Sequence, residues 1–123
     1  MPAPKNQPLT ARVLFACSGL AHGVRSERSL QLQLLTLGVV LVALAVLRPE
    51  PVWWALAIGS SALVIAAEMF NTAIEALADH LHPEIHPGIR VVKDCAAGAV
   101  LVTSIGALGV GAALVVHLIR GHS

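Results

Sequence analysis

The chain has 123 residues, of which 56% are hydrophobic and only 12% are charged, and its formal net charge is +1. A soluble domain has about a quarter of its residues charged, so this composition excludes an ordinary soluble protein, while the length favours a single domain. The net charge argues neither for nor against nucleic-acid binding, and we expect no nucleic-acid partner.

Three long stretches of the chain contain no charged residue: 29–47, 51–67 and 95–119. Each has the length, about 17–25 residues, that crosses a hydrocarbon core ~30 Å thick as an α-helix. A soluble bundle of three such helices would have too little polar surface to cover them. The sequence therefore predicts an all-α membrane protein with three transmembrane helices.

The N-terminal part of the chain is more polar and divides into two segments. Residues 1–9 contain Pro2, Pro4 and Pro8, and we expect them to form a flexible tail. Over about 10–28, apolar residues recur on one face of a helix, which favours an amphipathic helix at the membrane surface. A helix packed inside the transmembrane bundle is the alternative.

The transmembrane helices are expected over about 30–48, 52–79 and 94–119. The first ends at Arg48-Pro49-Glu50-Pro51, because proline cannot continue a helix and disfavours helical geometry in the residue before it. Together with the surface helix, the three helices make one domain over 10–123.

Lysine and arginine are unevenly distributed between the two ends of the predicted bundle. Those in the N-terminal segment and the second loop are Lys5, Arg12, Arg25, Arg28, Arg90 and Lys93, whereas the first loop and the C-terminal tail have only Arg48 and Arg120. Because cytoplasmic loops carry the excess of these residues, we expect the N-terminus and the second loop to face the cytoplasm. Most of the acidic residues then lie on the same side.

The second predicted transmembrane helix ends in a stripe of polar side chains. Spacings of 3, 4 and 4 residues place Glu68, Asn71, Glu75 and Asp79 on one helical face. Like charges four residues apart repel one another, and a charge beside an apolar stretch is costly, so the stripe indicates a function. Carboxylates one or two turns apart suit Mg²⁺ bound together with substrate phosphates. A helix extension that is simply solvated is the alternative.

Three further charged residues, in two places, each allow two interpretations. Lys93-Asp94, at the start of the third predicted transmembrane helix, is either a favourable contact with the helix dipole or part of a nucleotide phosphate site. Glu27 is either in a surface salt bridge or a further metal-binding carboxylate. Neither of the usual phosphate-binding loop motifs occurs, so nucleotide chemistry would need carboxylates, Mg²⁺ and a few cations.

The segment Glu68-Met69-Phe70-Asn71-Thr72-Ala73-Ile74-Glu75 resembles the E-x-x-N-[ST]-A-I-E signature of the prokaryotic diacylglycerol kinase and undecaprenol kinase family. Pro83-Glu84-Ile85-His86-Pro87 and the stretch from Lys93-Asp94 to Leu101 are similar too. The resemblance extends from about Thr10 to Val116 and is strongest over 68–101. It implies a homotrimer in the bacterial inner membrane, with active sites between subunits at the cytoplasmic face.

The resemblance also implies a role for each matching residue. Glu68 would be the general base that takes the proton from the lipid hydroxyl, and Asn71 would orient the base or the acceptor. Glu27 and Glu75 would bind Mg²⁺ with the ATP phosphates, and Asp79 would support the site. The implied ATP contacts are Arg12, Phe15, Glu27, Glu75, Glu84, Ile85, His86, Lys93 and Asp94, and the implied lipid contacts are Glu68, Ser18 and Leu30. Ile85 and Phe15 stand where family members often have tyrosine.

The implied activity is an ATP- and Mg²⁺-dependent lipid kinase. Its acceptor would be diacylglycerol, giving phosphatidic acid, or undecaprenol, giving undecaprenyl phosphate, and both remain open. The alternatives are a small oligomeric cation transporter or channel with an acidic path, and a structural membrane subunit. Because Glu68 ends its apolar stretch and does not lie in the middle of it, the sequence favours the kinase.

Overall fold

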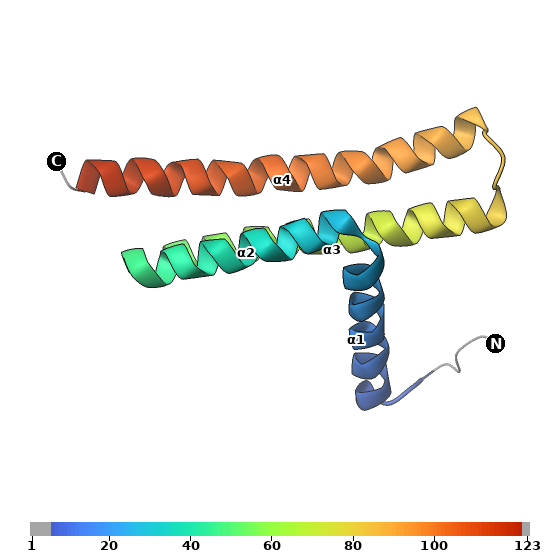
Figure 1. Ribbon diagram of the computed structural model, residues 1–123, viewed down its shortest axis with the longest axis horizontal. Helices are drawn as coiled ribbons and strands as arrows, with labels where there is room; N and C mark the ends of the chain where they lie inside the picture. Colours follow the sequence, from blue (N-terminus) through green and yellow to red (C-terminus); the bar gives the residue numbers. More distant parts are fainter. Residues whose placement is uncertain (1–5, 122–123) are drawn as a thin grey trace.

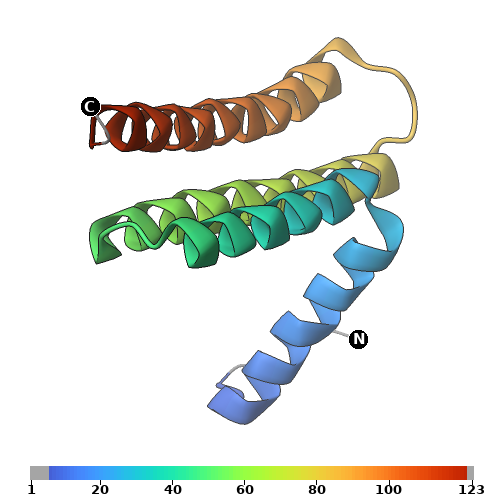
Figure 2. The same ribbon diagram turned by 60° about the vertical axis from the view of Figure 1, so that its left-hand side comes forward.

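Four consecutive α-helices make up the fold in a computed structural model that describes residues 6–121. They are α1 (Leu9–Ser26), α2 (Arg28–Leu47), α3 (Pro51–Leu81) and α4 (Pro87–Gly121). Figure 1 shows α2, α3 and α4 running alongside one another, with α1 leaving the start of α2 at a steep angle. Figure 2 separates α2 from α3 and shows α4 along another side of the bundle. Residues 1–5 of the expected tail, including Lys5, lie outside the described residues.

The helices α2, α3 and α4 are each long and apolar enough to cross a membrane. Large apolar side chains are exposed over much of their surface, among them Leu35, Val46 and Leu108. Soluble monomers rarely expose so large an apolar area, whereas a bilayer solvates it and helices satisfy their own backbone hydrogen bonds there. The prediction of an all-α membrane protein is confirmed.

The central helix of the bundle is α3. It packs against both α2 and α4, whereas no Cα atom of α2 comes within 8 Å of a Cα atom of α4 in residues 6–121. Ala57 and Val64 are buried on α3, Leu44 on α2 and Ala96 on α4. The small buried core therefore follows the length of α3, and the position of each site residue depends on its place along this helix.

Proline marks the helix boundaries. Arg48 ends α2 in the left-handed conformation, with φ of 49°, and donates its backbone N–H to the carbonyl of Leu44 at 2.8 Å. Both α3 and α4 start at a proline, Pro51 and Pro87, whose fixed φ suits the first helical position. The start of α4 at Pro87 differs from the expected start near Asp94, because the spacing of charges marks only the apolar part of a helix.

Both α3 and α4 are longer than a membrane requires. They have 31 and 35 residues, which at a rise of ~1.5 Å per residue makes them ~46 and ~52 Å long, against a hydrocarbon core of ~30 Å. The end of α3 and the start of α4 extend past α1, as Figure 1 shows. These two helix ends and the loop 82–86 therefore project beyond the apolar bundle.

The helix α1 lies outside the bundle. Gly23 is its one buried residue, and apolar side chains such as Leu14 and Phe15 are exposed. Within the described chain, α1 contacts α2 and α3 but not α4. The alternative of a helix packed inside the bundle is therefore not the arrangement adopted.

Candidate active site

A close approach at Gly23 holds the end of α1 against α3. A Cβ atom at Gly23 would lie 2.8 Å from Leu30 Cδ2 and 2.8 Å from Met69 Sδ, so a larger residue would require a shift. Leu30 is 1% exposed and fills the junction between the helices. Glu27 directly follows α1, and Glu68 directly precedes Met69 on α3. The close approach at Gly23 therefore brings Glu27 near Glu68.

Three carboxylates gather at this level. Glu68 is 7% exposed, the one buried charged residue within 6–121, and it interacts electrostatically with Glu27 and Glu75. Glu27 lies between α1 and α2; its backbone N–H donates to the carbonyl of Gly23 at 2.8 Å, and its side chain makes no capping hydrogen bond. Burying an acid beside two others is costly, so the cluster is suited to binding a cation or accepting a proton.

Asn71 lies one turn beyond Glu68 on α3. Its Nδ2 donates a hydrogen bond to Glu75 Oε1 at 3.3 Å. Its Oδ1 is buried and accepts no hydrogen bond from any group in residues 6–121. An unsatisfied buried acceptor costs about 1–3 kcal/mol, so this oxygen is well suited to accept a hydrogen bond from a hydroxyl group of a ligand.

Glu75 also lines a hollow of about 370 Å³ in the projecting part of the molecule, between the end of α3, the loop and the start of α4. The lining residues that the sequence also indicated are Glu75, Asp79, Glu84, Ile85, His86, Lys93 and Asp94. The hollow falls within the size range of small-molecule sites, about 300–1,000 Å³. Its charged walls suit a polar ligand such as a nucleotide.

The two cationic side chains that line the hollow, Lys93 and Arg90, each form an ion pair with a carboxylate. Lys93 Nζ pairs with Asp79 Oδ1 across the two helices, and Arg90 Nε pairs with Asp94 Oδ1 at 3.3 Å along α4. Because α4 starts at Pro87, Asp94 lies about two turns inside the helix. The interpretation of Asp94 as a contact with the dipole at a helix N-terminus therefore does not apply.

Sequence reasoning missed two polar residues of the hollow, His82 and Arg90. Arg90 lies four residues before Asp94, which is the spacing of ion pairs along a helix. The sequence would have indicated this pair if the helix had been expected to begin at Pro87. His82 is the last residue before Pro83, and only the folded loop shows what it contacts.

Three expected residues on α1 stand apart from the hollow. Arg12, Phe15 and Ser18 are exposed, and α1 makes no contact with α4 in the described part of the chain. Figure 1 shows the first turns of α1 pointing away from the loop between α3 and α4. Leu30, expected at the lipid, is buried in the junction with Gly23, so its influence on lipid binding would be indirect.

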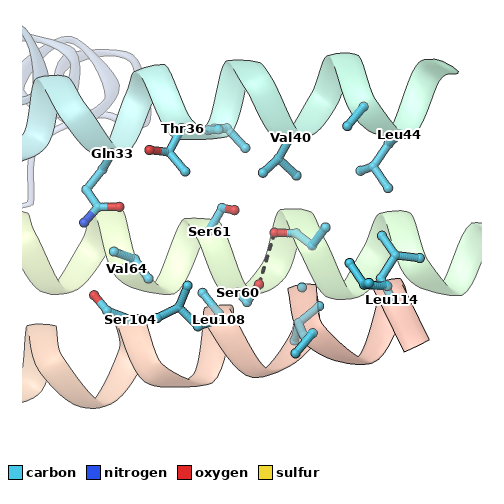
Figure 3. A pocket seen from close by; sticks show the side chains of 18 of the residues that line it. Gln33, Thr36, Val40, Leu44, Ser60, Ser61, Val64, Ser104, Leu108 and Leu114 are labelled. Carbon is cyan, nitrogen blue, oxygen red and sulfur yellow. Dashed lines mark hydrogen bonds between the residues drawn. The ribbon is translucent and has the colours of Figure 1, made fainter. Parts of the chain in front are cut away.

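A second hollow, of about 620 Å³, runs through the membrane-spanning part between α2, α3 and α4. In Figure 3, Val40 on α2, Val64 on α3 and Leu108 on α4 line this groove. Ser61 and Val64 precede Glu68 by seven and four residues and therefore share its helical face. The groove therefore lies along the face of α3 that also carries the buried carboxylate of Glu68.

The carboxylates fit Mg²⁺ only when it arrives with a phosphate ligand. Within residues 6–121, no group of three or more His, Cys, Asp or Glu side chains is arranged to hold a metal ion. Mg²⁺ commonly uses one or two carboxylates and completes its shell with waters and substrate phosphates. Glu27 and Glu75, both near Glu68, supply donors of that kind.

The chain is similar to known proteins over most of its length. The model of the prokaryotic diacylglycerol kinase family matches residues 14–115, which include the hollow and the three clustered carboxylates but not Arg12. A diacylglycerol kinase of Synechocystis sp. is 33% identical over 101 residues, which are 81% of this chain and 58% of that relative. The chain thus spans little more than half the length of this curated relative. By the extent of these matches, it belongs to the prokaryotic diacylglycerol kinase family.

Proposed function

We propose that this chain is a lipid kinase that transfers the γ-phosphate of ATP, with Mg²⁺, to the hydroxyl group of diacylglycerol and so forms phosphatidic acid. The observation that carries this proposal is the position of Glu75, which interacts with the buried Glu68, accepts a hydrogen bond from Asn71 and lines the hollow. A lipid hydroxyl at Glu68 and a nucleotide in the hollow would meet beside it. Membership of the family supports the same activity.

The depth of Glu68 suits a lipid acceptor. Counted from Pro51, Glu68 lies ~26 Å along α3 at ~1.5 Å per residue, close to the far edge of a hydrocarbon core ~30 Å thick. A diacylglycerol hydroxyl lies at the edge of the membrane while its acyl chains occupy the core. A carboxylate at this depth meets the hydroxyl without drawing the lipid out of the bilayer.

In the proposed reaction, Glu68 takes the proton of the lipid hydroxyl as the hydroxyl oxygen forms a bond to the γ-phosphorus. The bond from that phosphorus to the β,γ-bridging oxygen breaks, and ADP leaves. Asn71 Oδ1, which has no partner among residues 6–121, accepts a hydrogen bond from the hydroxyl as the lipid enters, and the hydroxyl then turns its one proton to Glu68. Phosphoryl transfer depends mainly on positioning and charge neutralisation, to which a positioned base adds about 10²–10⁴-fold.

The hollow supplies the nucleotide half of the proposed site. Glu27 and Glu75 would hold the Mg²⁺ that accompanies ATP, and this ion neutralises phosphate charge when bound. Lys93 and Arg90 provide two cations on the same wall of α4, and His86 provides a hydrogen-bonding ring on the loop. Asp79 supports the site by pairing with Lys93.

The groove between the membrane-spanning helices supplies the lipid half. It lies along the face of α3 that also carries Glu68, so a lipid with its hydroxyl at Glu68 would direct a hydrocarbon chain along Val64 and Ser61. Ser18 of α1 is a further proposed lipid contact at the membrane surface.

A homotrimer is part of the proposal. Arg12 and Phe15, which the family resemblance implies as ATP contacts, lie on α1, and no residue of α1 lines the hollow of the same chain. A neighbouring subunit would have to bring them to a nucleotide, which supports active sites shared between copies. The excess of lysine and arginine supports a bacterial inner-membrane orientation with the N-terminus and the second loop in the cytoplasm.

Undecaprenol is the second candidate acceptor. The stretch from Lys93 to Leu101, which contains Ala-Ala-Gly-Ala-Val-Leu, resembles undecaprenol kinases more than the enteric diacylglycerol kinases. A transporter or channel is less well supported, because its acid would lie in the middle of the span, whereas Glu68 lies at the end.

The test is phosphorylation of each lipid in turn. The purified protein is incubated with γ-labelled ATP and Mg²⁺ in mixed micelles that contain either diacylglycerol or undecaprenol. Label in diacylglycerol supports the first proposal, and label in undecaprenol alone selects the second. Label in neither lipid, from protein that still binds Mg²⁺ and ATP, would contradict both.

A further inference from the structure

The loop between α3 and α4 is organised by two histidines. His82 ends α3, and its backbone N–H donates to the carbonyl of Ala78 at 2.8 Å. Its side-chain Nδ1 lies 3.1 Å from the carbonyl oxygen of Glu84. Because a carbonyl oxygen can only accept, Nδ1 of His82 must hold the hydrogen of this bond.

The second histidine holds its hydrogen on the opposite nitrogen. The backbone N–H of Gly88 donates to His86 Nδ1 at 2.9 Å, so in the neutral ring the hydrogen is on Nε2. The centroids of the His82 and His86 rings are 5.2 Å apart, and the rings meet edge to face at 62°. Both side chains line the hollow.

Few other contacts restrain this loop. Ile85, its one large apolar residue, is fully exposed, and the flanking prolines Pro83 and Pro87 have no N–H to donate. The imidazole of His82 does not cap α3, because the hydrogen bond that ends this helix is donated by the backbone N–H of His82. Both side-chain contacts of His82 named above are made to the loop.

We propose that His82 is a positioning residue of the nucleotide site. It holds the Glu84 carbonyl through Nδ1–H and the His86 ring through the edge-to-face contact, so that His86 offers Nε2–H as a donor to a nucleotide in the hollow. This inference rests on the proposed function, and it adds a residue that the family resemblance does not indicate.

Three substitutions separate the two contacts. His82→Asn keeps a donor near the position of Nδ1 but removes the ring, His82→Phe keeps a ring but removes the donor, and His82→Ala removes both. His80→Ala is the matched control, because His80 is exposed on the same last turn of α3 and does not line the hollow. Each is measured in the full chain in mixed micelles, by the binding of Mg²⁺ with β,γ-methylene ATP and by kinetics at saturating lipid.

For His82→Asn and His82→Phe we expect an increase of about fivefold in the nucleotide Kd and in the KM for ATP, which corresponds to one net hydrogen bond or ring contact. His82→Ala should raise both constants by about tenfold or more, with kcat and the KM for the lipid unchanged. The double variant His82→Ala, His86→Ala should bind no more weakly than His86→Ala, because His82 acts through His86. An unchanged KM for ATP in His82→Ala, or additive effects in the double variant, would overturn the inference.

A nitrogen-15 NMR measurement tests the same idea without activity. The wild-type chain should show His82 protonated on Nδ1 and His86 on Nε2, and His82→Ala should shift the His86 ring signals while His80→Ala leaves them in place. The opposite tautomer at either histidine contradicts the inference even if the protein is a kinase. A wild-type protein without lipid phosphorylation that still shows these tautomers contradicts the kinase proposal and not the loop geometry.

Discussion

Asn71 donates a hydrogen bond from Nδ2 to Glu75 Oε1 at 3.3 Å, while its buried Oδ1 has no partner among residues 6–121. One amide thus contacts the carboxylate that lines the hollow and also keeps an acceptor available, one helical turn from the buried Glu68. This arrangement joins a site at the membrane boundary to a site in water over the two helical turns from Glu68 to Glu75.

Asn71→Asp should lower kcat at least about tenfold, since the loss of a hydrogen bond to a charged group is worth about 1.5–3 kcal/mol. Aspartate cannot donate to Glu75, and it adds a negative charge between Glu68 and Glu75. The measurement is the rate of lipid phosphorylation, with thermal unfolding as the check on folding. Full activity in the folded variant would contradict the role of this amide.

Glu68→Gln should reduce turnover by about 10²–10⁴-fold, the contribution of a general base, while binding of Mg²⁺ and ATP stays within about twofold of wild type. Glu50→Gln is the control, because Glu50 lies at the opposite end of α3, near His117. Turnover is measured at saturating ATP and lipid. Near-normal turnover in Glu68→Gln would remove the base assignment.

Glu75→Gln should weaken the binding of Mg²⁺ with ATP about tenfold or more, because an ionised ligand is lost. The amide still accepts a hydrogen bond from Asn71, so folding should change little. Nucleotide binding is titrated at several Mg²⁺ concentrations and again with the metal removed by a chelator. Equal loss of affinity in wild type and variant on Mg²⁺ removal would show that Glu75 does not act through the metal.

Ser61→Phe should raise the KM for the lipid about tenfold and leave the KM for ATP unchanged, because the larger side chain fills the groove on the face of Glu68. Leu63→Phe is the control, since Leu63 is exposed and does not line the groove. Kinetics are measured with lipid and ATP varied separately. If both variants behave alike, the groove does not receive the lipid chain.

Gly23→Ala should lower the free energy of unfolding by about 1–3 kcal/mol, the usual effect of overpacking. The Met69 side chain can move aside, but Leu30 is buried and cannot easily do so. Gly19→Ala, in the same helix with nothing within 4 Å of its added Cβ, should be neutral or gain up to about 1 kcal/mol from helix propensity. Thermal unfolding in detergent compares the two variants, and equal stability would contradict the close approach at Gly23.

The number of transmembrane helices could be predicted because each apolar stretch had a length that only a membrane-spanning helix explains. The start of α4 could not be predicted, because the turns from Pro87 to Asp94 are polar and resemble a loop in composition. The burial of Leu30 could not be predicted either, because its apolar character suits both a lipid contact and a core position. Periodicity along one helix does not show which neighbour a face packs against.

The amino-acid sequence by itself determined that the protein is helical and crosses a membrane, and that Glu68, Asn71, Glu75 and Asp79 share one face, because hydrophobic length and helical period are local properties. Only the tertiary structure decided that Glu27 approaches Glu68, that Lys93 pairs with Asp79 and that His82 meets His86. Those contacts join segments separated by a turn or by a whole helix. They depend on the close approach at Gly23 and on the packing of α4 along α3, which no local pattern records.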